Sequence, residues 1–527
     1  MAPSTAPVSL RPTPATTANP RICRAGSSCS SDCDWNTPSC WSRVRRPSGW
    51  TPPPPSGLAS GACRGPGASW VSWSSSGGVV VVVDSASGGS AGGTGAWAAA
   101  FIVAPLSRLR DAGALIWSCT LGTAIPLWAW GTAALAAAAA LGLTILLVSL
   151  IQVFSRAPRL APAPEPGAVV PPLPDTALTV VLPAYNEAAN IGPCLTSLLG
   201  SEAPCTDWRV LVVNDGSTDA TAALARAAAA ACGEAGQRFA LLEAGPRPAG
   251  ERWVGKNWAC TRAMEQVNTP WVLFVDADVR LRPATLRRAL GQAIAEGADL
   301  FSLAPRLRCD CLAEWMVQPI MASLLGLGFP IEAANDPASA VAFAAGPFML
   351  FRREAYGAIG GHRALAAEVV EDLALARRIK AAGYGLRYRL GLDALELRMY
   401  GDFASLWEGW TKNWLLGLDG SVAKALGAAA VVLLMFSGPW LLAPAAAIAA
   451  ALLPAERLPW LLALALAVAG IALQLMLRLW TRSQFQVPLT LWWLMGAGGL
   501  VVAAIGPTSV WRTLSGRGWT WKGRPLA

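Results

Sequence analysis

Three short apolar runs, each followed at once by polar or acidic residues, decide the fold of this chain. They are residues 178–187 (LTVVLPAYNE), 210–219 (VLVVNDGSTD) and 271–278 (WVLFVDAD). Short continuous apolar runs are typical of strands that are buried on both faces of a parallel sheet. Because the carboxyl ends of parallel strands meet at one edge, we expect the three polar clusters to converge on one crevice.

Helical patterns separate these runs. Apolar residues recur at helical spacing from Ile191 to Leu199, with Asn186 as the expected cap, and an alanine-rich helix is expected to begin near Thr218. Strands that alternate with helices predict an α/β, doubly wound sheet. This mixed segment follows a Pro-rich linker over 161–175 and ends near Gly427.

A membrane anchor is predicted before the mixed segment. Hydrophobic residues make up 54% of the 527 residues and charged residues only 14%, where soluble domains have roughly 25%. Residues 112–155 carry no charge, and their best single span is 133–154. Arg156 and Arg159 follow, so the positive-inside rule places the mixed segment in the cytoplasm.

Three more apolar stretches follow the mixed segment, over 427–453, 458–477 and 487–506. They predict C-terminal transmembrane helices within 427–507, followed by a basic tail over 508–527. Three crossings would place that tail on the wrong side of the bilayer for its charge. One stretch is therefore expected to be re-entrant or interfacial, and the pattern does not identify which one.

Residues 1–110 are rich in Ser, Pro, Gly, Trp and Cys and show no helical or strand period. They predict a disordered segment, or a non-native N-terminal extension from a start placed too far upstream. Basic residues give the chain a net charge of +9, but they flank apolar runs. The expected partner is therefore a membrane with anionic headgroups, and no nucleic acid. The single histidine, His362, makes a histidine zinc site and a Ser-His-Asp triad improbable.

The paired acids Asp276 and Asp278 predict a site for a hard cation. Two carboxylates on an extended segment can reach one Mg²⁺ or Mn²⁺, with phosphate oxygens completing the octahedron. A nucleotide sugar needs such a layout, because its diphosphate must be neutralised as the leaving group.

Five ordered motifs carry a resemblance to a known family. They are residues 182–187 (LPAYNE), 214–219 (NDGSTD), 255–259 (GKNWA), 274–278 (FVDAD) and 370–373 (VEDL). In this order they resemble the inverting family-2 glycosyltransferases, over residues 176–415. The resemblance implies a Rossmann-like glycosyltransferase A domain with N- and C-terminal transmembrane helices.

Two further segments, residues 345–351 (AGPFMLF) and 407–413 (WEGWTKN), narrow the resemblance, together with the GKNWA motif. They are similar to the membrane-bound members that glycosylate carotenoids or hopanoid-type lipids.

The resemblance implies a role for each motif residue. Asp276 and Asp278 would hold the metal and the diphosphate, and four residues would contact the nucleotide: Tyr185 and Glu187 at the base and ribose, Asp215 at the base, and Lys256 near the phosphates. Asn214 replaces an acid that is often found at its position.

Asp372 is the expected general base. A helix over 368–382, ended by Gly383, would point Glu371 and Asp372 in different directions, since successive helical residues differ by about 100°. Asp372 would then accept the proton of the acceptor hydroxyl, while Glu371 anchors the helix.

Together these expectations describe an integral membrane enzyme that transfers a sugar, with inversion, from a nucleotide-sugar donor to a carotenoid or hopanoid-like lipid acceptor. One alternative is a processive polysaccharide synthase or polyprenyl-phosphate sugar transferase, although Trp407-Glu-Gly-Trp410 differs from the Gln-X-X-Arg-Trp signature of processive synthases. Another is a non-catalytic nucleotide-binding membrane scaffold. Trp407, Trp410 and Trp414 are expected on a helix at the membrane surface.

Overall fold

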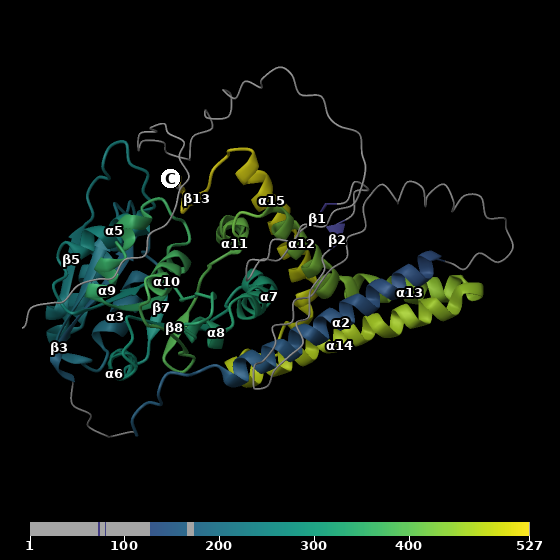
Figure 1. The fold of residues 1–527 in the computed structure, drawn as a ribbon, viewed down its shortest axis with the longest axis horizontal. Helices are drawn as coiled ribbons and strands as arrows, with labels where there is room; N and C mark the ends of the chain where they lie inside the picture. Colours follow the sequence, from purple (N-terminus) through teal and green to yellow (C-terminus); the bar gives the residue numbers. More distant parts are fainter. Residues whose placement is uncertain (1–71, 74–78, 81–126, 166–172, 526–527) are drawn as a thin grey trace, which may run out of the picture. The chain divides into compact units, whose positions relative to one another are not determined.

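The computed structural model describes residues 72–73, 79–80, 127–165 and 173–525 (Figure 1). The interpretation of residues 1–110 lies outside the described residues, apart from β1 (Ser72–Trp73) and β2 (Val79–Val80), which pair antiparallel. The beginning of the expected anchor, residues 112–126, lies outside them too. The features below belong to one compact unit, residues 119–527.

A seven-stranded sheet with the order β11-β8-β10-β6-β3-β4-β5 forms the centre of this unit. Its strands are β3 (Leu173–Ala184), β4 (Cys205–Asn214), β5 (Phe239–Glu243), β6 (Trp271–Val275), β8 (Leu300–Ala304), β10 (Phe348–Arg352) and β11 (Leu386–Leu390). The three apolar runs lie in β3, β4 and β6, which are parallel neighbours as expected. Strand β10 runs antiparallel to both β6 and β8, so the sheet is mixed.

Helices cover both faces of the sheet because its strands are apolar on both sides. Val180 and Leu182 pack on one face, with α3 (Ile191–Leu199), α4 (Thr221–Ala231) and α6 (Thr285–Ala295). Val181 points to the other face, with α5 (Gly255–Met264), α9 (Arg353–Ala358) and α10 (Glu371–Ala381). This alternation is the period of two that a strand imposes on its side chains.

Three expected helix starts are wrong by a few residues. The N-cap position of α3 is Asn190, since Asn186 has a φ of 50° and its side chain accepts a hydrogen bond from the Thr218 N–H instead. Helix α4 begins at Thr221. Helix α10 begins at Glu371 and not at residue 368, because the ψ of 68° at Val370 is not helical.

A small second sheet lies beside the main one in the order β7-β12-β9. It consists of β7 (Val279–Leu281), β9 (Arg306–Leu307) and β12 (Leu395–Leu397). Strand β7 begins directly after Asp278, so this sheet fixes the far end of the turn that carries the two expected metal ligands.

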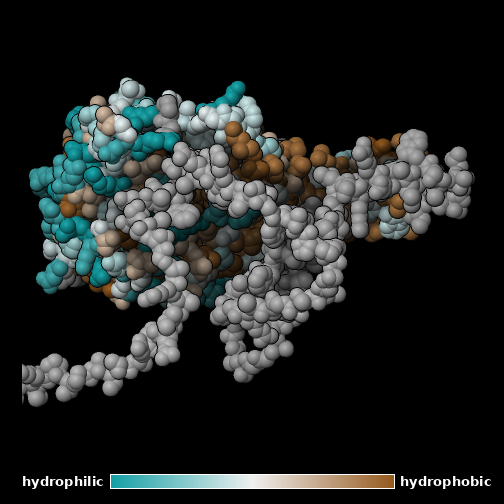
Figure 2. All heavy atoms as spheres, turned by 45° about the horizontal axis from the view of Figure 1, so that its top comes forward, coloured by the Kyte–Doolittle hydropathy of each residue, from teal (hydrophilic) through white to brown (hydrophobic). Residues whose placement is uncertain are grey.

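Among the described residues, four helical stretches are long and apolar enough to cross a membrane: Leu127–Arg156, Val422–Leu452, Pro454–Phe485 and Trp492–Leu514. They contain the predicted spans 133–154 and 458–477, while the predicted stretch 427–453 ends one residue after its helix and 487–506 begins five residues before its helix. The second consists of α12 (Val422–Val432), a π-helical turn (Leu433–Ser437) and α13 (Gly438–Leu452). Figure 2 shows hydrophobic side chains gathered on the long helices and hydrophilic ones on the sheet domain.

Three of these helices run side by side: α2 (Leu127–Arg156), α13 and α14 (Arg457–Phe485) (Figure 1). Their contact includes small side chains, such as Ala133 of α2, Ala446 of α13 and Ala463 of α14. Small residues let helix backbones approach closely, which is how helices associate in lipid.

The fourth helix, α15 (Met495–Leu514), packs mainly on other elements. It contacts α7 (Leu312–Gly328), α11 (Phe403–Gly417) and α12. A Cβ at Gly498 would lie 1.9 Å from the Met316 backbone oxygen of α7. The apolar window of α15 is 56% buried in protein, compared with 33–39% for the other three stretches. Helix α15 is therefore the apolar stretch that the protein covers most.

The expected surface position of the α11 tryptophans is wrong for two of the three. The Trp410 indole N–H donates to Gln318 Oε1 at 2.7 Å, and the Trp414 indole N–H donates to the Ala425 backbone oxygen at 3.1 Å. Both side chains are buried, and their indole N–H groups are not left unpaired there because each has a hydrogen-bond partner within the protein. Trp407 is half-buried and stacks on Phe403.

The close approach of α15 to α7 is open to test by a Gly498→Ala substitution. Its methyl group has no room beside the Met316 backbone, so the variant should lose about 1–3 kcal/mol of stability, the usual cost of overpacking. The measurement is thermal unfolding in detergent. Gly427→Ala in α12 is the matched control, since a Cβ there meets nothing within 4 Å. Equal midpoints for the two variants would contradict this packing.

Candidate active site

The loops that follow β3 and β4 are tied together by hydrogen bonds at the carboxyl edge of the sheet. The Asn186 N–H donates to Ser217 Oγ at 3.0 Å, and the Glu187 N–H donates to Thr221 Oγ1 at 2.8 Å. The Asn214 side chain donates to Glu243 Oε2 at 2.7 Å and so joins this edge to the end of β5. The polar clusters after β3 and β4 therefore form one rim, as predicted.

Asp215 lies at the base of this rim and is only 6% exposed. The Arg247 guanidinium donates to its carboxylate at 2.8 Å, and the Arg524 guanidinium also pairs with it. Burial raises the pKa of Asp215, while the two guanidinium groups act to lower it. Gly255 is required here, because a Cβ would lie 2.5 Å from the Asp215 carboxylate.

A cavity of about 480 Å³ opens beside Asp215. It is lined by Asp215, Gly216, Glu243, Gly245, Pro246, Arg247 and Arg524. Its volume lies within the range of small-ligand pockets, and its walls carry both acidic and basic groups.

Lys256, at the start of α5, connects two other predicted motifs. Its ammonium lies 2.6 Å from Asp276 Oδ1 and 2.7 Å from Glu371 Oε1. Burial disfavours a charged lysine, but the two carboxylates outweigh it and raise the pKa of Lys256 well above its ordinary value. Burial likewise acts to raise the pKa of Glu371, yet the Lys256 ammonium and local hydrogen bonds leave that pKa below its usual range.

Asp278 fits a cation ligand. Its Oδ1 is buried and has no hydrogen-bond partner within the described part of the chain. Burial and the neighbouring Asp276 and Glu187 carboxylates raise the pKa of Asp278 well above its ordinary value. A divalent cation would give this oxygen a partner and remove the repulsion. No group of three or more His, Cys, Asp or Glu gathers as a metal site within the described ranges, so other oxygens would have to complete the shell.

Asp372 and Glu371 have different partners, although they are adjacent in sequence. Asp372 accepts from the Gly346 N–H at 3.1 Å and from the Leu373 N–H at 2.8 Å, while Glu371 pairs with Lys256. Burial and the Glu371 charge raise the pKa of Asp372 to about 6. Asp372 is thus a more basic carboxylate than an ordinary aspartate.

Two basic residues near the end of the chain reach the rim, and sequence reasoning placed them only in a basic tail. Lys522 lies 2.6 Å from Glu187 Oε1, and the Arg524 guanidinium lies 3.9 Å from the centre of the Tyr185 ring. Lys522 lies in the turn between the short paired strands β13 (Thr520–Trp521) and β14 (Arg524–Pro525), and Arg524 begins β14. Their charge was visible in the sequence, but no spacing connected it to a loop more than 300 residues earlier.

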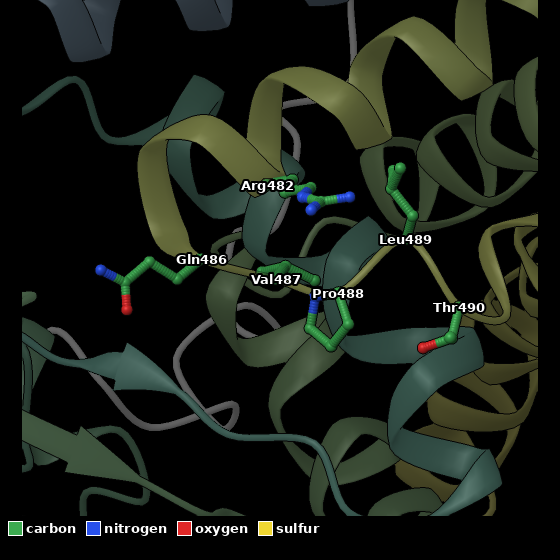
Figure 3. A pocket seen from close by; sticks show the side chains of 6 residues that line it. All are labelled: Arg482, Gln486, Val487, Pro488, Leu489 and Thr490. Carbon is green, nitrogen blue, oxygen red and sulfur yellow. The ribbon is translucent and has the colours of Figure 1, made fainter.

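A second cavity, of about 470 Å³, opens where α14 ends (Figure 3). It is lined by Arg482, Gln486, Val487, Pro488, Leu489 and Thr490. None of the predicted site residues lines it, so it is separate from the rim around Asp215.

Comparison with known proteins agrees with this geometry. Residues 179–360 match the family model for glycosyl transferase family 2. The chain is 31% identical over 263 residues to the 4,4'-diaponeurosporenoate glycosyltransferases of Staphylococcus aureus strains MRSA252 and USA300. The match covers 49% of this chain and 66% of each relative, slightly less than two thirds of their length.

Among solved structures, a mannosyltransferase from Pyrobaculum calidifontis in complex with GDP-Man and Mn²⁺ is 19% identical, with a TM-score of 0.39. The likeness covers 72% of this chain and 99% of that one. A TM-score this low does not establish a common fold by itself.

The family match is therefore the basis of the assignment, and it includes β3, β4, β6 and β10 with the motifs that follow the first three. The predicted α/β domain with apolar helices before and after it is confirmed. Residues 179–360 therefore resemble glycosyl transferase family 2, and this range holds the first four of the five ordered motifs.

Proposed function

We propose that this chain is a membrane enzyme that transfers a sugar from a nucleotide-sugar donor to a lipid acceptor, with inversion at the anomeric carbon. The observation that carries the proposal is the Lys256 bridge. It joins the Asp276 carboxylate, which follows β6, to Glu371, and Glu371 is the neighbour of Asp372, whose pKa is raised to about 6. Groups for donor and acceptor chemistry therefore share one cluster.

The donor is proposed to bind along the rim. Asp215 would receive the base, Tyr185 and Glu187 would line the base and ribose, and Lys256 would face the phosphates. The cavity beside Asp215 has room for the nucleoside. Asp276 and Asp278 would hold Mg²⁺ or Mn²⁺, which neutralises the diphosphate as it leaves.

Asp372 is proposed to act as the general base. The acceptor oxygen attacks the anomeric carbon while the bond from that carbon to the diphosphate oxygen breaks, and the acceptor proton passes to Asp372. Hydrogen bonds from Gly346 and Leu373 hold the carboxylate in place, and Glu371 keeps Lys256 beside it. A carboxylate with a pKa near 6 is ionised at neutral pH and is a better base than an ordinary aspartate.

The acceptor is proposed to be a lipid of the carotenoid or hopanoid type. Two observations support it: the relatives are glycosyltransferases named for 4,4'-diaponeurosporenoate, and apolar helices pack directly on the catalytic unit. The proposed domains are a catalytic domain over 176–415 between an anchor within 112–155 and membrane helices within 427–507. A processive synthase would add more than one sugar to each acceptor.

Contacts of the basic tail support a definite topology. Lys522 touches Glu187, so the tail and the donor rim lie on one side of the bilayer. The chain between residue 421 and the tail must then cross an even number of times. We assign the two crossings to the stretch Val422–Leu452, which ends in α13, and to α14, and place the more deeply covered α15 at the interface on the cytoplasmic side.

Membranes that contain the protein test the proposed reaction directly. We expect one labelled sugar to pass from a panel of labelled nucleotide sugars to a lipid, which mass spectrometry then identifies. Asp278→Ala should lower transfer by at least about 100-fold, since metal charge stabilisation is worth several kcal/mol. A variant within a few-fold of wild type, with the same metal dependence, would contradict the role of Asp278.

Asp372 and Glu371 are adjacent, so their amide variants form a matched pair that identifies the general base. Asp372→Asn should lose about 10²- to 10⁴-fold in turnover with nearly unchanged donor affinity, because an amide cannot accept a proton. Glu371→Gln should do less. If Glu371→Gln is the dead variant instead, the roles are reversed.

The pH profile of wild-type turnover should follow Asp372. The raised pKa means that the carboxyl is protonated, and inactive as a base, below about pH 6. Turnover should therefore rise with pH through about 6 and then level off. A flat profile between pH 5 and pH 7 would argue against Asp372 as the base.

Cysteine labelling of intact cells tests the topology. A cysteine at Ala455, in the turn between α13 and α14, should react with an impermeant reagent, with native labelling subtracted. Cysteines at Arg262 and at Ser515, which follows α15, should stay unlabelled. Labelling at Ser515 but not at Arg262 would mean that α15 crosses the bilayer.

A further inference from the structure

We infer that residues 516–524 are part of the donor site and that Arg524 and Lys522 bind the nucleoside diphosphate of the donor. This inference rests on the proposed function, and names two donor-binding residues that lie beyond the matched family region. Four kinds of observation support it: the contacts of Arg524 and Lys522, the contacts that hold their segment in place, the negative charge of the rim, and the open volume of the cavity beside Asp215.

Arg524 makes three contacts on the rim. Its guanidinium pairs with the Asp215 carboxylate, donates to the Asp215 backbone oxygen at 3.0 Å and stacks on the Tyr185 ring at 3.9 Å. An arginine fork held by a carboxylate and an aromatic face is fixed in orientation, so its remaining N–H groups point in a defined direction.

Lys522 spans the neighbouring loop. Its ammonium donates to the Asn186 backbone oxygen at 2.9 Å and the Tyr185 backbone oxygen at 3.3 Å, and it pairs with Glu187. The Asn186 backbone has a positive φ of 50°, a conformation that few residues adopt, and Lys522 is attached at that bend.

Residues 516–524 are held in place by side chains of α11. The Lys412 ammonium of α11 lies 4.5 Å from the centre of the Trp521 ring, and Thr520 hydrogen-bonds to Glu408 of the same helix. Three glycines with φ between 65° and 78° form the bends of the segment: Gly516, Gly518 and Gly523. The two cations are therefore presented by a folded strand pair and not by a loose end.

The charge of the rim explains why cations are needed there. Four carboxylates converge on it: Glu187, Asp215, Asp276 and Asp278. A nucleoside diphosphate brings further negative charge, so an acidic site without nearby cations would repel it. Arg524 and Lys522 supply two positive charges at the nucleoside end, and Arg247 supplies a third.

The open volume of the cavity indicates that Arg524 forms part of its wall and does not block it. The cavity of about 480 Å³ stays open with Arg524 in place, and Arg524 is one of its lining residues. A base and ribose fit a cavity of this size. A segment that blocked the site would have filled it.

Binding of UDP and GDP, with Mn²⁺, to the full chain in detergent tests the inference by calorimetry. Arg524→Ala should weaken the affinity for whichever diphosphate binds wild type by about tenfold or more, and Lys522→Ala by several-fold, since charge-assisted hydrogen bonds are lost. Arg524→Lys should recover part of the affinity. Arg308→Ala is the control, because Arg308 is an exposed cation outside the proposed site that pairs with Asp310; its affinity should stay within about twofold of wild type.

The outcomes separate the inference from the proposed function. If wild type binds a diphosphate and Arg524→Ala binds it equally well or more tightly, residues 516–524 are not part of the donor site, and tighter binding would make them a plug. If folded wild type binds neither diphosphate nor any nucleotide sugar, the proposed function itself fails, and the inference fails with it. An unchanged thermal midpoint of Arg524→Ala would show that lost affinity is not lost folding.

Discussion

The half-buried ammonium of Lys256 is the interaction on which the site depends. Asp276 and Asp278 come from one motif and Glu371 and Asp372 from another, and like charges brought together in a poorly solvated place repel strongly. One cation between Asp276 and Glu371 lets the helix α10 lie against the turn after β6. Lys256 also makes the two adjacent acids differ in pKa. Glu371 stays ionised beside Lys256, while Asp372 keeps a pKa near 6.

The sheet and the membrane helices are joined through α7, α11 and α15. The glycines of α15 let it lie directly on the backbone of α7, and Trp410 and Trp414 of α11 bury their indole groups in the same core. The end of α15 leads into the segment that touches Glu187 and Asp215. The rim around Asp215 is thus connected to the apolar helix α15 by a short folded path.

Sequence patterns predicted the parallel strands β3, β4 and β6 and the apolar helices, because their signal is local: continuous apolar runs and the residues that end them. The antiparallel β10 was missed since its apolar run FMLF looks the same in either direction. Tryptophans of α11 were placed at the membrane surface because composition does not show that Gln318, far away in sequence, offers a hydrogen bond. Arg247 and Lys522 were missed for the same reason: their partners Asp215 and Glu187 are set by the fold.

The pairing of α2 with α14 also governs how the protein assembles. Helix α2 ends at Arg156 and α14 begins at Arg457, so the ribosome makes the whole sheet domain before the partner of α2 exists. Until then the alanine stripe of α2 faces lipid, which is tolerable since lipid tails are as apolar as a neighbouring helix. The sheet domain is therefore complete in the growing chain before α14 can close the helical bundle.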